Sequence, residues 1–200
     1  MSLILTIIIL IFALSIHEAA HAKVADILGD PTPKYLGRVS LNPIKHLDPM
    51  GTAVFLITAI SGGPVFGWGK PVVFNPANLK NPKRDAGLVA LAGPASNILT
   101  ATITIAIVPF INIVLIQGVL VQFVILNVIL AVFNLIPIYP LDGFNIVAGF
   151  LPNNLSRDFS ETSKYGIWIL LLLILTNAIS KILSPVIWFV LNIFRLMGVT

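Results

Sequence analysis

The amino-acid sequence predicts an α-helical polytopic membrane protein. Of its 200 residues, 57% are hydrophobic and only 10% are charged, and the mean hydropathy is +0.99. A soluble domain carries about 25% charged residues, so this chain has too few charges to cover a water-exposed surface. Several apolar runs are also long enough to cross a bilayer, which takes about 20 residues per helix. These observations exclude a soluble globule, a disordered chain and a collagen-like chain.

The net charge of +4 and the pI of about 9.6 do not indicate a nucleic-acid-binding protein. The excess is small, and membrane proteins concentrate lysine and arginine in their cytoplasmic loops. The chain has no cysteine, which excludes disulfides, thiolate metal ligands and a thiol nucleophile. We therefore expect the lipid bilayer as a partner, and no nucleic acid.

Three apolar runs are predicted to form spanning helices. Residues 3–22 would be about 30 Å long as a helix, which matches the hydrocarbon thickness of a bilayer. Residues 87–110 and 112–137 are the second and third spans, joined by a very short turn. We expect these three helices to form the core of the protein.

Two further apolar regions are less regular. Residues 50–66 are short for a span and end in the letters SGGP, so they either turn back or cross the membrane. Residues 165–179 and 182–196 are parted near Lys181 and are predicted to form a C-terminal helical hairpin. This reading divides the chain into a core, residues 1–150, and a C-terminal transmembrane hairpin, residues 151–200.

Two polar stretches between the spans resemble each other. Residues 37–43 and 69–76 are both β-prone runs that end in Asn-Pro, where the residue before proline is pushed into an extended conformation. We expect short strands at the membrane surface, with unrelated loops as the alternative.

The first span contains three titratable residues, His17, Glu18 and His21. Ionisable groups are expensive inside a bilayer, so they indicate a functional site. Histidines four residues apart lie on one face of a helix, close enough to bind one metal ion, and neutral imidazole is a usual zinc ligand. Glu18 would lie beside the metal, where a general base for attacking water is needed. The alternative is a pair of core histidines with Glu18 as their partner.

Asp142 is the candidate for a third metal ligand. It follows residues 134–141, which contain two prolines, and it precedes Gly143. This pattern presents a carboxylate from unwound backbone, which is tolerated at membrane depth only where it faces protein or water. Alone, the pattern is an ordinary turn, but the histidine pair upstream favours a ligand and a site with one zinc per chain.

The second span contains the segment 93–97, with letters GPASN. Its small residues allow close helix packing, and its proline frees a backbone carbonyl. For Asn97, packing between helices and a substrate-positioning or oxyanion role are equally consistent with the pattern.

These motifs, in this order, resemble those of the site-2 protease family of intramembrane zinc metalloproteases. The residues that carry the resemblance are the histidine pair with Glu18, the segment 93–97 and residues 134–143. Residues 42–49 and 67–72 look like the small branch of the family, which lacks PDZ-like and CBS-like domains. The resemblance covers most of residues 1–150.

The resemblance implies a metalloprotease that hydrolyses peptide bonds of transmembrane protein substrates, within or near the membrane. It implies zinc held by His17, His21 and Asp142, with Glu18 as the catalytic base. This chain departs from the family in having no span before the catalytic helix.

The distribution of basic residues gives an independent test of topology. If residues 50–66 turn back, eleven of the twelve lysines and arginines lie on one side and only Lys181 on the other. If they cross, the division is five against seven, and the bias is lost. Because basic residues concentrate in the cytoplasm, we expect the turned-back arrangement. It brings His17 and Asp142 to the same side, in a multi-pass cell-membrane protein whose active site faces the cytoplasm.

A membrane metal or ion transporter and a catalytically silent scaffold are the alternative functions. Transporters usually contain duplicated halves, whereas each motif occurs once here. A silent scaffold is disfavoured because every candidate catalytic group is present.

A substrate helix must unwind before its peptide bonds can be attacked, and an exposed strand edge can bind the extended form. Val72 and Val73, preceded by Pro71, are the predicted edge, since proline suits an edge strand. For His46, a surface or loop-bracing role is favoured over a place in the site.

Overall fold

The computed structural model describes residues 2–61 and 67–196. Its longer helices are α1 (Leu3–Leu28), α3 (Pro49–Ile60), α4 (Pro82–Ile107), α5 (Val114–Asn134), α6 (Asp142–Phe150), α7 (Asn153–Ser160), α8 (Ser163–Leu175) and α9 (Ala178–Leu196). A short helix, α2 (Thr32–Tyr35), follows α1.

Three helices within the described residues, α1, α4 and α5, are long and apolar enough to cross a membrane. Large apolar side chains of these helices face outward, such as Phe12, Leu99 and Leu115. So many exposed apolar side chains on three long helices are expected in contact with lipid rather than water. The fold is that of an α-helical polytopic membrane protein, as the composition predicts.

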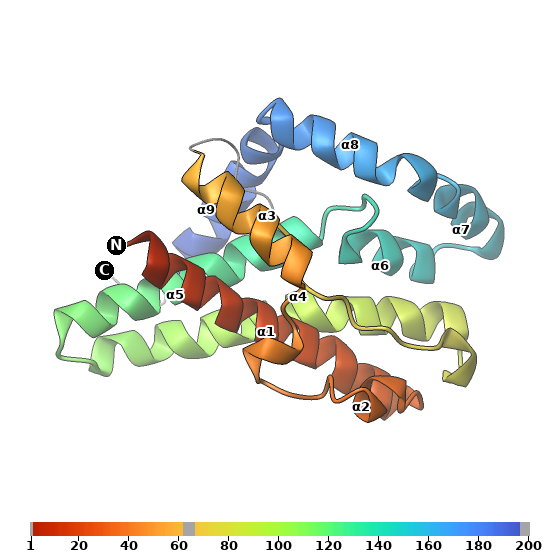
Figure 1. Cartoon of the computed structure of the whole chain (residues 1–200), viewed down its shortest axis with the longest axis horizontal. Coiled ribbons are helices and arrows are strands. Elements are labelled where there is room, and N and C mark those ends of the chain that lie inside the picture. The colour runs from red at the N-terminus through yellow and green to blue at the C-terminus, as the bar shows by residue number, and fades with distance from the viewer. Residues whose placement is uncertain (1, 62–66, 197–200) are drawn as a thin grey trace.

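Helix α4 is the centre of the molecule, because it packs against α1, α5 and α6. In the view of Figure 1, α1 runs in front of the antiparallel pair α4 and α5, and α6 lies between α4 and α8. An apolar core lies between α4, α5 and α9, where Ala101, Val128 and Leu183 are buried. Its close packing fixes the position of α4 relative to α5, and both helices contribute residues to the polar site described below.

The ends of the segment between Leu47 and Gly69, which contains α3, lie together. Leu47 and Gly69 form an isolated antiparallel bridge, and the Lys70 amide donates to the His46 carbonyl at 2.8 Å. Trp68 also returns to the start of α3, where it covers Gly51. The segment therefore begins and ends at one place, as the turned-back arrangement requires.

The short strands expected over residues 37–43 and 69–76 do not form, and the bridge at Gly69 is the one β contact there. The Asn42 side chain accepts from the Ile44 amide and the Asn75 side chain from the Ala77 amide, both at 3.1 Å. Each Asn-Pro pair thereby starts a 3₁₀ turn, which ends the extended run.

The C-terminal helices differ from the predicted hairpin. Helices α8 and α9 meet at 80°, with the break at residues 176–177 rather than near Lys181. Asn177 takes a left-handed conformation there, with φ of 55°. The sequence is evenly apolar on both sides of residues 176–177, so hydropathy did not place the break between α8 and α9. The division into residues 1–150 and 151–200 stays a prediction.

Asp30, just after α1, holds the connection to α4 in place. Its buried carboxylate accepts hydrogen bonds from the Thr32 hydroxyl at 2.6 Å, the Asn75 amide at 2.6 Å and the Asn78 side chain at 2.7 Å. Burial alone would raise the pKa of Asp30, but these hydrogen bonds outweigh burial and hold it below its ordinary value.

The depressed pKa of Asp30 makes stability depend on acid pH. The contribution is fully present above the ordinary pKa of about 3.9 and is lost as the pH falls through the folded pKa. We expect thermal unfolding in detergent to show a steep loss of stability below about pH 4 in the native protein and a flatter profile in Asp30→Asn. At neutral pH, Asp30→Asn should be less stable by about 1–3 kcal/mol. Parallel pH profiles would contradict this assignment.

Candidate metal centre

His17 and His21 lie on the face of α1 that packs against α4, and these residues are only 3% and 7% exposed. Nδ1 of His17 is 2.6 Å from Oδ1 of Asn97, and Nδ1 of His21 is 2.7 Å from the Val89 carbonyl oxygen. Both partners are acceptors, so each Nδ1 carries the proton. In the neutral rings, each Nε2 then keeps a free lone pair, which is the form that binds metal.

Asp142, at the start of α6, completes the cluster. Its Oδ2 atom lies 3.0 Å from Nε2 of His17 and 3.4 Å from Nε2 of His21. The backbone reaches this position by a tight turn, because a Cβ on Gly143 would come within 2.3 Å of the Leu135 carbonyl oxygen. The three ligand atoms lie within 4.8 Å of one another. Of the described residues, these three form the group that could hold a metal ion.

The polar atoms of this cluster fit a cation. Oδ2 of Asp142 is buried and has no hydrogen-bond partner within the described part of the chain. It faces Nε2 of His17 and Nε2 of His21. In a neutral ring whose proton is on Nδ1, Nε2 has no proton to donate. Three lone pairs that converge in a dry environment repel one another unless a positive charge lies between them. Two imidazoles and a carboxylate are a usual donor set for zinc.

Gly93 of α4 leaves the space between the two histidines. A Cβ at this position would lie 2.4 Å from Nε2 of His21 and 2.6 Å from Nε2 of His17. Any side chain here would occupy the volume that the metal requires. The glycine of the segment 93–97 is therefore part of the site as well as a packing residue.

Asn97 is fully buried, and its amide group is engaged on both sides. Its Oδ1 atom meets His17, and its Nδ2 atom donates to the Ala13 carbonyl at 3.2 Å and to Asn127 Oδ1 at 2.8 Å. This geometry favours orienting His17 over contacting a substrate.

Asn127 is a residue that the sequence analysis missed. It lies on α5, is fully buried, and donates to the Phe123 carbonyl while it accepts from Asn97. The signal was present, because an amide in the middle of an apolar span needs a buried partner. The sequence could not show which partner it meets.

Glu18 is next to the metal cluster but does not belong to the three-residue group. Its side chain is 12% exposed, and Oε2 lies 4.0 Å from Nη2 of Arg38. His46 is fully buried, and its Nε2 lies 2.6 Å from the Ser40 carbonyl oxygen, which is a loop-bracing position.

Val72 and Val73 lie outside any strand. Val72 is partly buried and Val73 is exposed. Among the described residues, no hydrogen bond engages their backbone groups.

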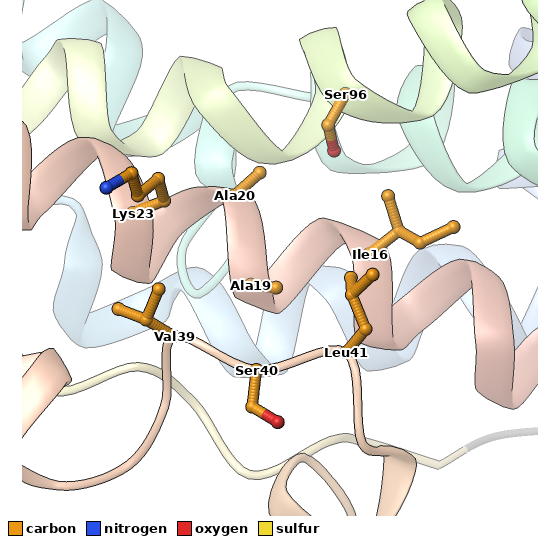
Figure 2. Close-up of a pocket in the computed structure, with 8 residues that line it drawn as sticks. All are labelled: Ile16, Ala19, Ala20, Lys23, Val39, Ser40, Leu41 and Ser96. Carbon is orange, nitrogen blue, oxygen red and sulfur yellow. The ribbon is translucent and has the colours of Figure 1, made fainter.

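A groove of about 390 Å³ runs along α1 on the side of the loop over residues 38–42. Figure 2 shows α1 between α4 and this loop. The groove is lined by Ile16, Ala19, Ala20, Lys23, Val39, Ser40, Leu41 and Ser96. The backbone groups of Val39 and Leu41 have no hydrogen-bond partner in the described structure, whereas Ser40 is bonded through both its N–H and its carbonyl. The Ser40 N–H bonds to the Arg38 carbonyl and the His46 ring meets the Ser40 carbonyl, so this loop is a local turn that leaves the backbone groups of Val39 and Leu41 free beside the groove.

Comparison with known proteins identifies the family. The chain is 36% identical over 194 residues to the protein named "Putative zinc metalloprotease YwhC" of Bacillus subtilis (strain 168), covering 90% of this chain and 84% of that protein. The chain belongs to Peptidase family M50. Its residues 111–176 match that family directly. It is also 28% identical over 185 residues to "Putative zinc metalloprotease Rip2" of Mycolicibacterium smegmatis (strain ATCC 700084 / mc(2)155), covering 90% of this chain and 70% of that protein. No solved structure matches the chain significantly.

Membership of family M50 confirms the resemblance to site-2 proteases. The protein is a zinc metalloprotease, and its substrate is a protein. The residues that match the family directly, 111–176, include Asp142 but not His17 or His21.

The space at Gly93 can be tested by zinc binding. We expect Gly93→Ala to weaken zinc affinity by at least about tenfold, because the new methyl group would push the two histidines apart. Gly118→Ala on α5 is the matched control, since nothing lies within 4 Å of that Cβ position. Zinc content and chelator competition of the two purified variants give the measurement. Equal affinity in both would show that the metal lies elsewhere.

Proposed function

We propose that this M50 protease is an intramembrane endopeptidase that cleaves single-span membrane proteins, with its active site open to the cytoplasm. In this proposal His17, His21 and Asp142 hold one zinc ion, and Glu18 is the general base. The observation that carries the proposal is the convergence of three buried lone-pair atoms inside a bundle of apolar helices.

Zinc in such a site polarises the scissile carbonyl and lowers the pKa of a bound water to about 7. Glu18 takes a proton from the attacking water while the water oxygen bonds to the carbonyl carbon of the substrate. The same carboxyl group then gives a proton to the leaving amine as the C–N bond breaks. Asn97 and the Val89 carbonyl keep the histidine rings in the ligating tautomer.

The depth of the site supports a membrane-embedded substrate. His17 lies six residues before Lys23, so it is about 9 Å deeper along the helix. Residues of α1 that precede the histidines, such as Ile8 and Phe12, face outward as lipid-exposed groups would. A peptide that reaches this depth must itself be apolar.

The distribution of charge supports the cytoplasmic orientation. Ten of the twelve lysines and arginines fall on the side of the spans to which α1 and α5 both lead: Lys23, Lys34, Arg38, Lys45, Lys70, Lys80, Lys83, Arg84, Arg157 and Lys164. The connection at residues 108–113 on the other side contains none. This count assumes that the segment between Leu47 and Gly69 does not cross the membrane. The bridge between its two ends supports that assumption.

A substrate helix has to unwind to be cut, and two exposed segments offer free backbone groups to an extended peptide. One is the groove edge at Val39 and Leu41, beside α1. The other is the predicted edge at Val72 and Val73. Both lie on the cytoplasmic side in the proposed topology.

Glu18→Gln tests the proposed chemistry. We expect cleavage to fall by about 10²–10⁴-fold with zinc retained, because the amide keeps the shape of Glu18 but cannot accept a proton. Asp142→Ala should instead lose zinc. Cleavage of a panel of single-span fusion proteins in liposomes, and of casein as a soluble comparison, gives the measurement.

Glu161→Gln is the matched control, since it changes the only other glutamate, which is exposed. Substantial cleavage by Glu18→Gln would refute the general base. Cleavage of casein but of no fusion protein would refute the intramembrane substrate.

Two substitutions test where the peptide binds. Ala20→Leu fills the groove and should raise KM with zinc retained, whereas Ala53→Leu, on an exposed face of α3, should not. Val73→Pro removes one free backbone donor and should lower cleavage of helical substrates if the second edge is used. Native cleavage in both Ala20→Leu and Val73→Pro would contradict strand addition at these edges.

A further inference from the structure

Arg38 is a buried cation outside the metal cluster. It lies in the loop after α2, is 5% exposed, and its backbone amide donates to the Pro33 carbonyl at 2.8 Å. Burying a guanidinium is unfavourable unless its hydrogens and its charge are compensated. The partners of Arg38 therefore indicate what the residue is for.

The first partners of Arg38 are two backbone carbonyls. Nη1 donates to the Lys45 carbonyl and Nη2 to the Lys70 carbonyl. These residues flank the two ends of the segment between Leu47 and Gly69, which the Leu47–Gly69 bridge joins. The planar guanidinium of Arg38 thus bonds to the backbone before the segment, at Lys45, and after it, at Lys70.

The third partner is Glu18. Its Oε2 atom lies 4.0 Å from Nη2 of Arg38, and the two side chains are 12% and 6% exposed. Opposite charges at this distance attract more strongly in a dry environment than at the surface. Among the described residues, Arg38 is the basic side chain that forms an ion pair with Glu18.

We propose that Arg38 is a positioning residue for the catalytic base. The guanidinium is fixed by the two carbonyls, and it holds the Glu18 carboxylate at the edge of the metal cluster. The same guanidinium thereby contacts Glu18 and the backbone beside both ends of the segment between Leu47 and Gly69. This inference rests on the proposed role of Glu18. It adds a residue that acts through Glu18 and touches neither metal nor ligand.

The carbonyl contacts distinguish arginine from lysine at this position. A lysine ammonium would restore the charge beside Glu18, but it is a point charge and cannot span both carbonyls. A misplacement of the base by about 1 Å is enough to lower the rate roughly 100-fold. We therefore expect Arg38→Lys to restore only part of the activity that Arg38→Ala loses.

The experiment compares Arg38→Ala, Arg38→Lys and the control Arg157→Ala in the full chain. Arg157 is a suitable control because its side chain is 79% exposed. For each variant, kcat, KM, zinc content and thermal stability are measured on one cleaved fusion protein. We expect Arg38→Ala to lower kcat by roughly 10–100-fold, with zinc content and KM near those of the native protein. Arg157→Ala should leave all four quantities unchanged.

Chemical rescue separates positioning from a purely structural role. Guanidinium ion at a non-denaturing concentration should raise kcat of Arg38→Ala but not of Glu18→Gln, and urea, which is neutral and of similar shape, should raise neither. Native kcat in Arg38→Ala would overturn the proposal. Loss of zinc or of folding without rescue by guanidinium would assign Arg38 to loop structure and overturn it too. Activity that survives in Glu18→Gln would refute the proposed function itself, which distinguishes the two failures.

Discussion

The structure depends on three lone pairs that converge inside the bundle of apolar helices. Nε2 of His17, Nε2 of His21 and Oδ2 of Asp142 converge in a buried cluster. Such an arrangement is unfavourable in an apolar bundle unless a cation joins it. Three neighbouring residues of α4 help to maintain this arrangement. Gly93 leaves the space between the histidines, and Oδ1 of Asn97 and the Val89 carbonyl oxygen accept hydrogen bonds from the two Nδ1–H groups.

Helix α4 transmits this constraint to the rest of the fold. It contacts α1, which carries the histidines, and α6, which begins with Asp142. On its third side it packs against α5, where Asn127 meets Asn97. A polar chain therefore runs from α5 through α4 to α1, and each amide in it is bonded. Because unpaired amides are costly in a dry interior, this chain also fixes the rotation of the helices about their axes.

The polar loops on the proposed cytoplasmic side are organised by buried charges as well. Asp30 gathers backbone and side-chain donors from residues 32–78, and Arg38 joins the carbonyls of Lys45 and Lys70. Neither loop contains a regular sheet, yet both are anchored. Side-chain hydrogen bonds have replaced the ladder that the β-prone runs suggested. The result is an irregular cover over α1 that leaves the groove in Figure 2 open.

The membrane class, the three spans and the three candidate metal ligands were all predictable from the sequence. These follow from local facts: apolar run length, a four-residue spacing on one helix, and a carboxylate after two prolines. Only the tertiary structure decided that the segment after Leu47 returns beside Gly69, that α8 and α9 meet at 80°, and that Asn127 and Arg38 belong to the site's surroundings. Each of these depends on contacts between residues far apart in the chain or on one backbone angle. Neither long-range contacts nor a single backbone angle changes the hydrophobic periodicity from which sequence-based predictions are made.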